Sequence, residues 1–253
     1  MRDKTFFVTD AHLGSGADSR RREADLVRWL DAVAPEAKRI VMLGDIFDFW
    51  FTYRRAVPRG FVRLLGKMAE LVDSGIELHF FIGNHDMWMF DYLEREVGVV
   101  MHGEPTAFEW EGRHFLLGHG DGLDRSDRKY LFLKRVFRSR FNQWLFAGIH
   151  PNIGFPVALR WSANSRRRHS LKDNGYLGDD KESIYQYCRQ RQQAAQAQGL
   201  VPFDYFLFGH RHTPVCRPLG DAAYINVGNW IENRDYAVFD GSKVRLCSFA
   251  AEE

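Results

Sequence analysis

The chain has 253 residues, of which 45% are hydrophobic and 27% are charged, and these proportions are typical of a globular domain with a full core. It contains no apolar run of about 18 residues, so we expect no membrane-spanning helix. The first residues lead directly into strand-like sequence without a secretory hydrophobic region, which favours a cytoplasmic protein. Three widely spaced cysteines, Cys188, Cys216 and Cys247, argue against a disulfide framework or a zinc ribbon.

The net charge of +2 conceals a basic block between Arg125 and Lys172. The block contains twelve basic residues and one acidic residue, Asp127, so it carries +11 and leaves −9 for the remainder of the chain. A basic block in an otherwise acidic chain predicts an anionic partner for that block.

The first half of the sequence alternates between strand and helix patterns. Strands are predicted at 4–9, 39–43, 77–82, 105–110 and 113–117, and helices at 20–33 and 59–73. Strands that alternate with helices favour a parallel sheet with crossover connections.

The sequence from about 126 to 198 has helical periodicity and carries the basic block. One apolar face is formed by Tyr130, Leu133, Phe137, Phe141, Trp144 and Leu145. We expect Pro151 and Pro156 to interrupt the helical pattern before a segment through Trp161 and a helix over 179–197. Two interpretations of the apolar face stay open: it binds an apolar ligand, or it packs against the core.

The last part of the chain returns to strand patterns. These are predicted at 203–208, 214–217, 222–227, 235–239 and 243–248. Strands early and late, with helices between them, predict an α/β fold in which two packed sheets are flanked by helices. The chain would form a single domain over 1–253, with 122–198 as a helical cap inserted within it.

Five short segments end strand-like runs with residues that bind metals or phosphate. They are Asp10-Ala11-His12, Gly44-Asp45 with Asp48, Gly83-Asn84-His85-Asp86, Gly118-His119-Gly120-Asp121 and Gly209-His210-Arg211-His212. Each pattern alone also occurs in simple turns, but five of the ten histidines fall within these segments. Because strand ends converge at one edge of a sheet, the segments together predict a metal centre.

Hydrolysis of a phosphate ester or anhydride needs an activated water and compensation for phosphoryl charge. Two divalent cations supply both functions. The mixture of imidazole, carboxylate and amide groups suits Mn²⁺, Fe or Zn better than Mg²⁺ or Ca²⁺.

The order of the five segments resembles that of the calcineurin-like metallophosphoesterases. This resemblance implies an αββα sandwich of two mixed sheets and two metal ions. It places Asp10, His12 and His212 on one ion, Asn84, His119 and His210 on the other, and Asp45 between both.

The same resemblance implies roles for four further residues. His85 would face the substrate and either stabilise the phosphoryl charge or protonate the leaving oxygen, with Asp86 orienting its ring. Asp48 and Asp121 would hold metal ligands in place.

Further stretches are similar to the UDP-2,3-diacylglucosamine diphosphatases of lipid A synthesis. They are Asp45-Ile46-Phe47-Asp48-Phe49-Trp50, Asn84-His85-Asp86-Met87-Trp88 and Trp161-Ser162-Ala163-Asn164-Ser165. This likeness implies Mn²⁺-dependent hydrolysis of UDP-2,3-diacylglucosamine to UMP and 2,3-diacylglucosamine 1-phosphate (lipid X). It also makes Asn164, Arg166 and Arg167 candidate substrate-binding residues. His85 departs from the pattern, since members of this group often have Arg at that position.

Alternative functions stay open on the sequence alone. The basic block is compatible with a nuclease or another phosphodiesterase of the same superfamily, although we expect no nucleic-acid partner. A non-enzymatic scaffold is disfavoured, because it would not need a full set of metal ligands. The amphipathic, basic insertion predicts peripheral contact with the anionic inner face of a membrane. The oligomeric state stays open.

Overall fold

The computed structural model describes residues 2–124, 126–170 and 175–250, except for the side chains of 165–170. The strands are β1 (Lys4–Val8), β2 (Ala37–Met42), β3 (Glu77–Phe81), β4 (Val100–His102), β5 (Thr106–Trp110), β6 (Arg113–Gly118), β7 (Tyr205–Phe208), β8 (Val215–Leu219), β9 (Ala222–Asn226), β10 (Asp235–Phe239) and β11 (Val244–Ser248). The helices are α1 (Ser19–Val33), α2 (Val62–Asp73), α3 (Tyr92–Val97), α4 (Arg128–Arg138), α5 (Arg140–Ala147), α6 (Pro151–Ser170) and α7 (Ser183–Ala197).

The strands form two mixed sheets. The first has the order β11-β10-β1-β2-β3-β4, and the second has the order β5-β6-β7-β9-β8. Strands β1 to β4 are parallel, whereas β10 and β11 are antiparallel to their neighbours. In the second sheet β6, β7 and β9 are parallel, and the edge strands β5 and β8 are antiparallel. The predicted pair of mixed sheets is therefore confirmed.

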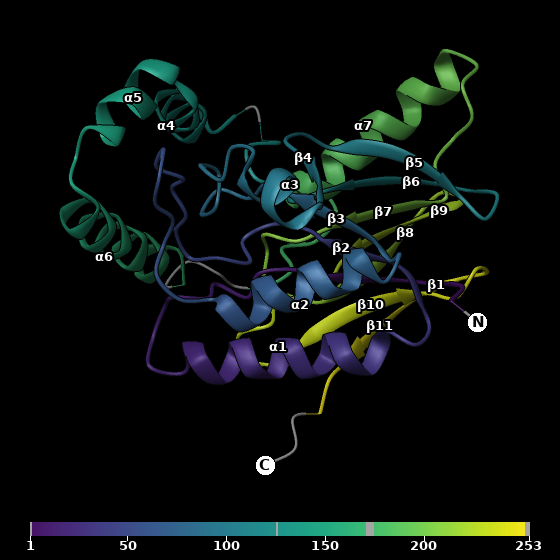
Figure 1. The fold of residues 1–253 in the computed structure, drawn as a ribbon. Coiled ribbons are helices and arrows are strands. Elements are labelled where there is room, and N and C mark those ends of the chain that lie inside the picture. Colours follow the sequence, from purple (N-terminus) through teal and green to yellow (C-terminus); the bar gives the residue numbers. More distant parts are fainter. Residues whose placement is uncertain (1, 125, 171–174, 251–253) are drawn as a thin grey trace.

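Side-chain alternation along the strands divides the core into layers. In β1, Phe6 and Val8 pack with Trp29 of α1 on the outer face of the first sheet. Phe7 points the other way and packs with Phe115 of the second sheet. Because successive side chains of a strand face opposite sides, one apolar strand can serve both layers. Figure 1 shows α1 and α2 along the first sheet, opposite the second sheet.

The predicted insertion at 122–198 divides into two parts. Helix α7 belongs to the sandwich, because Ile184 and Cys188 are buried against Phe206 and Tyr224 of the second sheet. It supplies the fourth layer of the expected αββα arrangement. Helices α4, α5 and α6 instead stand away from the sheets on one side of the molecule (Figure 1), and these three helices form the cap.

Three local features differ from the sequence-based expectations. The helical pattern is interrupted before Pro151, since α5 ends at Ala147 and α6 begins at Pro151, but Pro156 lies inside α6 and does not end it. Proline is well tolerated at the first helical position, whereas Pro156 lies in the second turn, where it removes one backbone hydrogen bond of α6 without ending the helix. Helix α3 and strand β4, which the periodicity did not predict, have only six and three residues. Elements this short carry too few repeats to produce a pattern.

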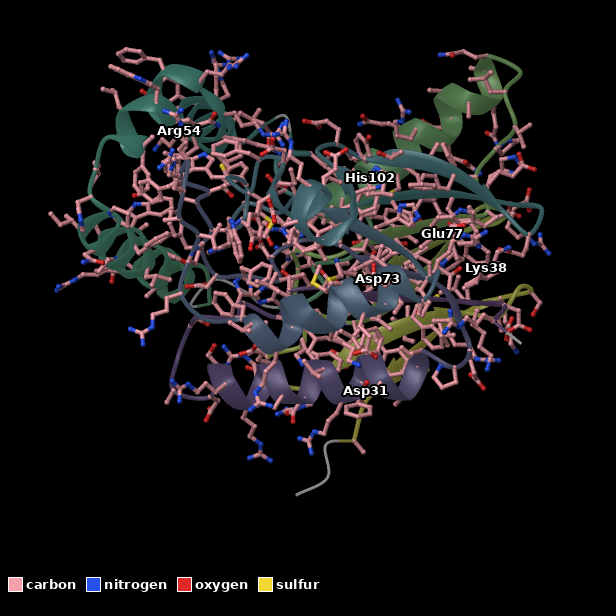
Figure 2. All side chains as sticks on the ribbon, viewed as in Figure 1. Asp31, Lys38, Arg54, Asp73, Glu77 and His102 are labelled. Atoms are coloured by element: carbon pink, nitrogen blue, oxygen red, sulfur yellow. The ribbon has the colours of Figure 1, made fainter. Side chains whose placement is uncertain are left out.

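The parallel strands are oriented so that their carboxyl ends face the cap. Lys38 and Glu77, near the amino ends of β2 and β3, lie at the end of the sandwich far from the cap (Figure 2). The loops after these strands therefore lie between the sandwich and the cap. Among the residues that the structure describes, no helix combines the length and the apolar character needed to cross a membrane.

Candidate metal centre and active site

The five segments follow the carboxyl ends of β1, β2, β3, β6 and β7. Five of their non-glycine residues have a left-handed backbone: Asp10 (φ 51°), His12 (φ 43°), Asp45 (φ 53°), His210 (φ 71°) and His212 (φ 54°). This conformation is disfavoured for residues with a Cβ, and it concentrates at functional sites. The strained turns therefore coincide with the predicted metal ligands.

The first group of ligand-type side chains is Asp10, His12 and His212. Nε2 of His212 lies 3.1 Å from Oδ1 of Asp10 and 3.2 Å from Nε2 of His12. Their ligand atoms lie within 4.8 Å of one another. Asp10 and His12 are buried, although they belong to polar residue types.

The second group is centred on His119. Its Nε2 atom lies 3.2 Å from Oδ1 of Asn84 and 3.2 Å from Oδ2 of Asp45. Asp45, His119 and His210 form another set whose ligand atoms lie within 4.8 Å of one another. Oδ2 of Asp45 is also 3.8 Å from Nε2 of His12, so this carboxylate lies between the two groups.

Two histidine rings, those of His119 and His12, are oriented by contacts that their Nδ1 atoms make on the side away from the centre. Nδ1 of His119 lies 2.8 Å from the backbone oxygen of Leu43, and Nδ1 of His12 lies 3.3 Å from Oδ1 of Asp48. A carbonyl oxygen only accepts, so Nδ1 of His119 donates, and in the neutral ring Nε2 carries the lone pair that would face a metal ion. This is the arrangement that metal-binding histidines usually have.

Two glycines in the segments are required by close approach. A Cβ at Gly83 would collide with the side chain and backbone of Asp45, and a Cβ at Gly209 would collide with Thr9 and Asp10. The glycines thus let neighbouring strand ends come together closely enough to form one site.

Charges in the centre influence one another strongly. Burial opposes ionisation of Asp10 and Asp45, but nearby histidines outweigh it and hold the pKa of both carboxyls well below its usual range. Burial likewise opposes protonation of His119, but Asp45 outweighs it and raises the pKa of His119 to about 10. Burial, assisted by His119, lowers the pKa of His210 to about 4.

The donor set fits divalent cations. It contains four imidazoles, two carboxylates kept ionised and the amide oxygen of Asn84, gathered in one small, partly buried region. The raised pKa of His119 reflects the attraction of the Asp45 carboxylate for a positive charge at this position. A divalent cation would supply that charge more effectively, and this mixture of ligands suits Mn²⁺, Fe or Zn.

His85 lies at the edge of this centre. Its ring packs edge-on against His12 at 4.7 Å between centroids, and it forms a third possible ligand set with His12 and Asp45. Nδ1 of His85 lies 3.1 Å from the backbone oxygen of Asp48 and 2.8 Å from Oγ of Ser162. Burial lowers the pKa of His85 to about 4.

Asp86 has different partners from those expected, which corrects its assignment as the group that orients His85. Its carboxylate accepts hydrogen bonds from the backbone N–H groups of Gly83 (2.8 Å) and Ile46 (3.0 Å). Because these amides belong to two loops, Asp86 holds the loop after β2 against the loop after β3. The ring of His85 is held by Asp48 and Ser162 instead. Burial, with Asp45 nearby, raises the pKa of Asp86 to about 7.

Asp121 connects the centre to the cap. Its carboxylate accepts a hydrogen bond from Oη of Tyr130 at 3.0 Å and pairs with Nζ of Lys134 at 2.7 Å. Of the three candidate substrate-binding residues, Asn164 is exposed on α6. The side chains of Arg166 and Arg167 lie outside the described residues.

A sixth loop contributes to the site and was missed from the sequence. It follows β9, and the side-chain amides of Asn226, the last residue of β9, and Asn229, in the loop, donate to the backbone oxygens of Gly209 and His212. These bonds fix the turn that carries two predicted ligands. The stretch Ala222–Asn226 followed by Gly228-Asn229 has the same signature as the other segments, an apolar strand ending in glycine and polar residues.

The cap exposes a large apolar surface. Neither α4 nor α5 contains a buried residue. Phe141 is 64% exposed, Trp144 is 69% exposed and Val157 of α6 is 62% exposed. Part of the apolar face of 130–145 packs against the sandwich, since Phe137 contacts Trp88, but packing against the core does not account for the exposed Phe141 and Trp144. Large apolar side chains exposed on all three cap helices indicate a surface that binds a ligand, a membrane or another protein.

Comparison with known proteins agrees with this geometry. The family model described as calcineurin-like phosphoesterase matches residues 4–214. The chain belongs to the calcineurin-like phosphoesterase family. Membership of this family, together with the clustered His and Asp side chains, makes the protein a metal-dependent hydrolase.

Several relatives of this phosphoesterase share one name. A protein from Porphyromonas gingivalis named UDP-2,3-diacylglucosamine hydrolase is 38% identical over 97% of each chain. One from Aeromonas hydrophila with the same name is 28% identical over 96% of this chain and 97% of its own length. Among solved structures, an archaeal phosphodiesterase aligns over 97% of this chain and 99% of its own, with 12% identity and a TM-score of 0.49.

Proposed function

We propose that this phosphoesterase hydrolyses the pyrophosphate bond of UDP-2,3-diacylglucosamine in lipid A biosynthesis, releasing UMP and 2,3-diacylglucosamine 1-phosphate (lipid X). The observation that carries this proposal is the position of a widely exposed apolar cap beside a centre built for phosphate chemistry. A substrate with a diphosphate and two acyl chains needs both surfaces. The names of the relatives support the same substrate.

We assign the ligand-type side chains to two divalent cations, for which we propose Mn²⁺. Asp10, His12 and His212 would hold one ion, Asn84, His119 and His210 the other, and Asp45 would contact both. When bound, the ions would neutralise phosphoryl charge and lower the pKa of the attacking water.

The remaining residues would bind and orient the substrate. His85 would stabilise charge on the phosphoryl group or transfer a proton to the leaving oxygen. Asn164, Arg166 and Arg167 of the cap would contact the polar part of the substrate, with the Arg side chains pairing with phosphate.

We also propose that the protein is cytoplasmic and contacts the inner face of the membrane with its cap. Exposed basic residues stand among the exposed apolar side chains of the cap: Arg128, Lys129, Arg135, Arg138, Arg140 and Arg160. Such a surface favours an anionic lipid leaflet without spanning it.

The test is incubation of the Mn²⁺-loaded protein with UDP-2,3-diacylglucosamine in ¹⁸O-labelled water, followed by mass spectrometry. We expect UMP and lipid X, with one labelled oxygen in one of the two products, and no turnover by the metal-stripped protein. Hydrolysis of simple phosphodiesters without attack on this substrate would reject the lipid assignment. Steeply salt-dependent binding and cleavage of DNA or RNA would favour a nuclease instead.

A further inference from the structure

Ser162 is unusual among the residues of α6. Of the α6 residues whose side chains the structure describes, only Gly154 and Ser162 are buried. Ser162 is 2% exposed, whereas Trp161 beside it is 50% exposed. A polar side chain that is buried on an otherwise exposed helix requires hydrogen-bond partners on the element it faces.

Two hydrogen-bond partners of Ser162 belong to the catalytic core. Its Oγ atom lies 2.8 Å from Nδ1 of His85 and 3.2 Å from the backbone oxygen of Asp48. Nδ1 of His85 is itself 3.1 Å from that same oxygen. Since a carbonyl oxygen only accepts, Nδ1 carries the hydrogen of the neutral ring, and the Ser162 hydroxyl donates to the carbonyl. Nε2 is then the ring nitrogen left for a substrate.

We propose that Ser162 is a positioning residue for His85, through which the docking of the cap helix α6 is coupled to phosphoryl transfer. The proposal rests on the proposed function of His85 at this site. Ser162 and His85 are 77 positions apart in sequence. Their contact exists only while α6 lies against the loops after β2 and β3.

The geometry indicates which position of α6 favours the orientation of His85 that catalysis needs. The ring of His85 rests edge-on against His12, so rotation about its side-chain bonds would carry Nε2 away from the centre. With Ser162 in place, Nδ1 has two oxygen neighbours on the side away from the centre. If α6 withdrew, Nδ1 would lose its contact with Oγ of Ser162, and its contact with the backbone oxygen of Asp48 would remain. His85 is therefore best oriented when the cap is docked.

The second buried position of α6 supports a defined docking geometry. A Cβ at Gly154 would lie 2.7 Å from Oη of Tyr53, in the loop after β2, and 3.2 Å from the ring of Phe146. The helix thus approaches the core closely at both Gly154 and Ser162. Close approach at two points two helical turns apart fixes both its distance and its rotation.

The test compares Ser162→Ala with Ser162→Thr and with Ser139→Ala. Ser139, at the start of α5, makes no capping hydrogen bond with its side chain. We expect Ser162→Ala to lower kcat about 3- to 30-fold, in line with the loss of one buried hydrogen bond, with little change in KM or metal content. Ser162→Thr should recover most of the rate, and Ser139→Ala should behave as wild type.

A double variant shows whether Ser162 acts through His85. If it does, adding Ser162→Ala to His85→Gln should cause no further loss of rate. Losses that multiply, or a rate of Ser162→Ala within twofold of wild type, would overturn the proposal. As an activity-independent readout, ¹⁵N spectra of histidine-labelled protein should show Nδ1 protonated in the wild type and a mixed tautomer in Ser162→Ala. Identical spectra would also overturn it.

The rates should be measured on UDP-2,3-diacylglucosamine and on bis(4-nitrophenyl) phosphate in parallel. If the wild type cleaves only the aryl diester, the lipid assignment fails, while the double variant still tests the coupling on that substrate. If it cleaves the lipid substrate and Ser162→Ala is equally fast, the coupling fails while the proposed function stands.

Discussion

The Oδ2 atom of Asp45 lies 3.2 Å from the Nε2 atom of His119. The same oxygen is 3.8 Å from Nε2 of His12, and the other oxygen accepts a hydrogen bond from the backbone N–H of His85. One carboxylate thus joins the two groups of ligand-type side chains and the loop that carries His85. Removal of this carboxylate should therefore affect both groups of ligand-type side chains and the position of the loop that carries His85.

Asp45→Asn should abolish turnover by loss of metal. The amide keeps the shape of the side chain but removes the negative charge that would face both cations, so we expect the metal content to fall to one ion per chain or fewer and the rate to fall by about 10³-fold or more. Elemental analysis and UMP release measure the two effects. Asp73→Asn, at the end of α2, is the matched control (Figure 2). Full metal content in Asp45→Asn would show that this carboxylate is not a ligand.

His85→Gln should separate catalysis from metal binding. If His85 acts on the substrate, the rate should fall about 10²-fold with two ions still bound. Because His85 also lies within ligand distance of His12 and Asp45, metal content is the deciding measurement. Metal loss equal to the loss of rate would make His85 a ligand instead. His150→Gln, in an exposed part of the cap, is the control.

Trp144→Ser should weaken binding of the acylated substrate alone. Trp144 is 69% exposed, so its replacement should change the free energy of unfolding by less than about 0.5 kcal/mol. Loss of an apolar contact with an acyl chain should raise KM for UDP-2,3-diacylglucosamine about tenfold. KM for a water-soluble aryl phosphodiester should not change. Leu200→Ser, 58% exposed and outside the cap, is the control, and an equal effect of both variants would contradict an acyl-binding cap.

The pair His79 and His102 should make the fold less stable in acid. Nδ1 of His79 lies 3.1 Å from Nε2 of His102; burial lowers the pKa of both, and that of His102 falls to about 4. Unfolded histidine takes up a proton below about pH 6.5. Between about pH 6.5 and pH 4 the unfolded state therefore binds more protons, so this contribution to stability is full above that window and is lost as the pH falls through it.

His102→Gln should accordingly reduce the difference in unfolding free energy between pH 7 and pH 5 by about 1 kcal/mol. Urea unfolding at the two pH values measures it. His102 lies on the edge strand β4 (Figure 2) and is not among the predicted metal ligands, so metal content should not change. The exposed His150→Gln is again the control. If the unfolding free energy of His102→Gln changed between pH 7 and pH 5 as much as that of the wild type, the lowered pKa of His102 would not be the cause of the acid sensitivity.

The sequence by itself determined how the sheets and helices are layered and at which end of the strands the site lies. The uninterrupted apolar run Phe6-Phe7-Val8 specifies a strand buried on both faces, and the polar residues that follow such strands must meet at one sheet edge. For this reason both the αββα arrangement and the convergence of the five segments could be predicted. The family pattern in those segments was equally readable, because it depends only on order and residue type.

Only the tertiary structure decided how individual groups are used. Asp86 follows His85 in sequence, yet its carboxylate bonds to amides of two loops, while Ser162 reaches the His85 ring from 77 positions away. Such contacts depend on how α6 docks, and periodicity contains no information about docking. The same holds for the helical stretches: α7 packs on the second sheet, whereas α4 fully buries none of its apolar residues. The neighbouring surface, rather than the pattern itself, decides what an amphipathic helix covers.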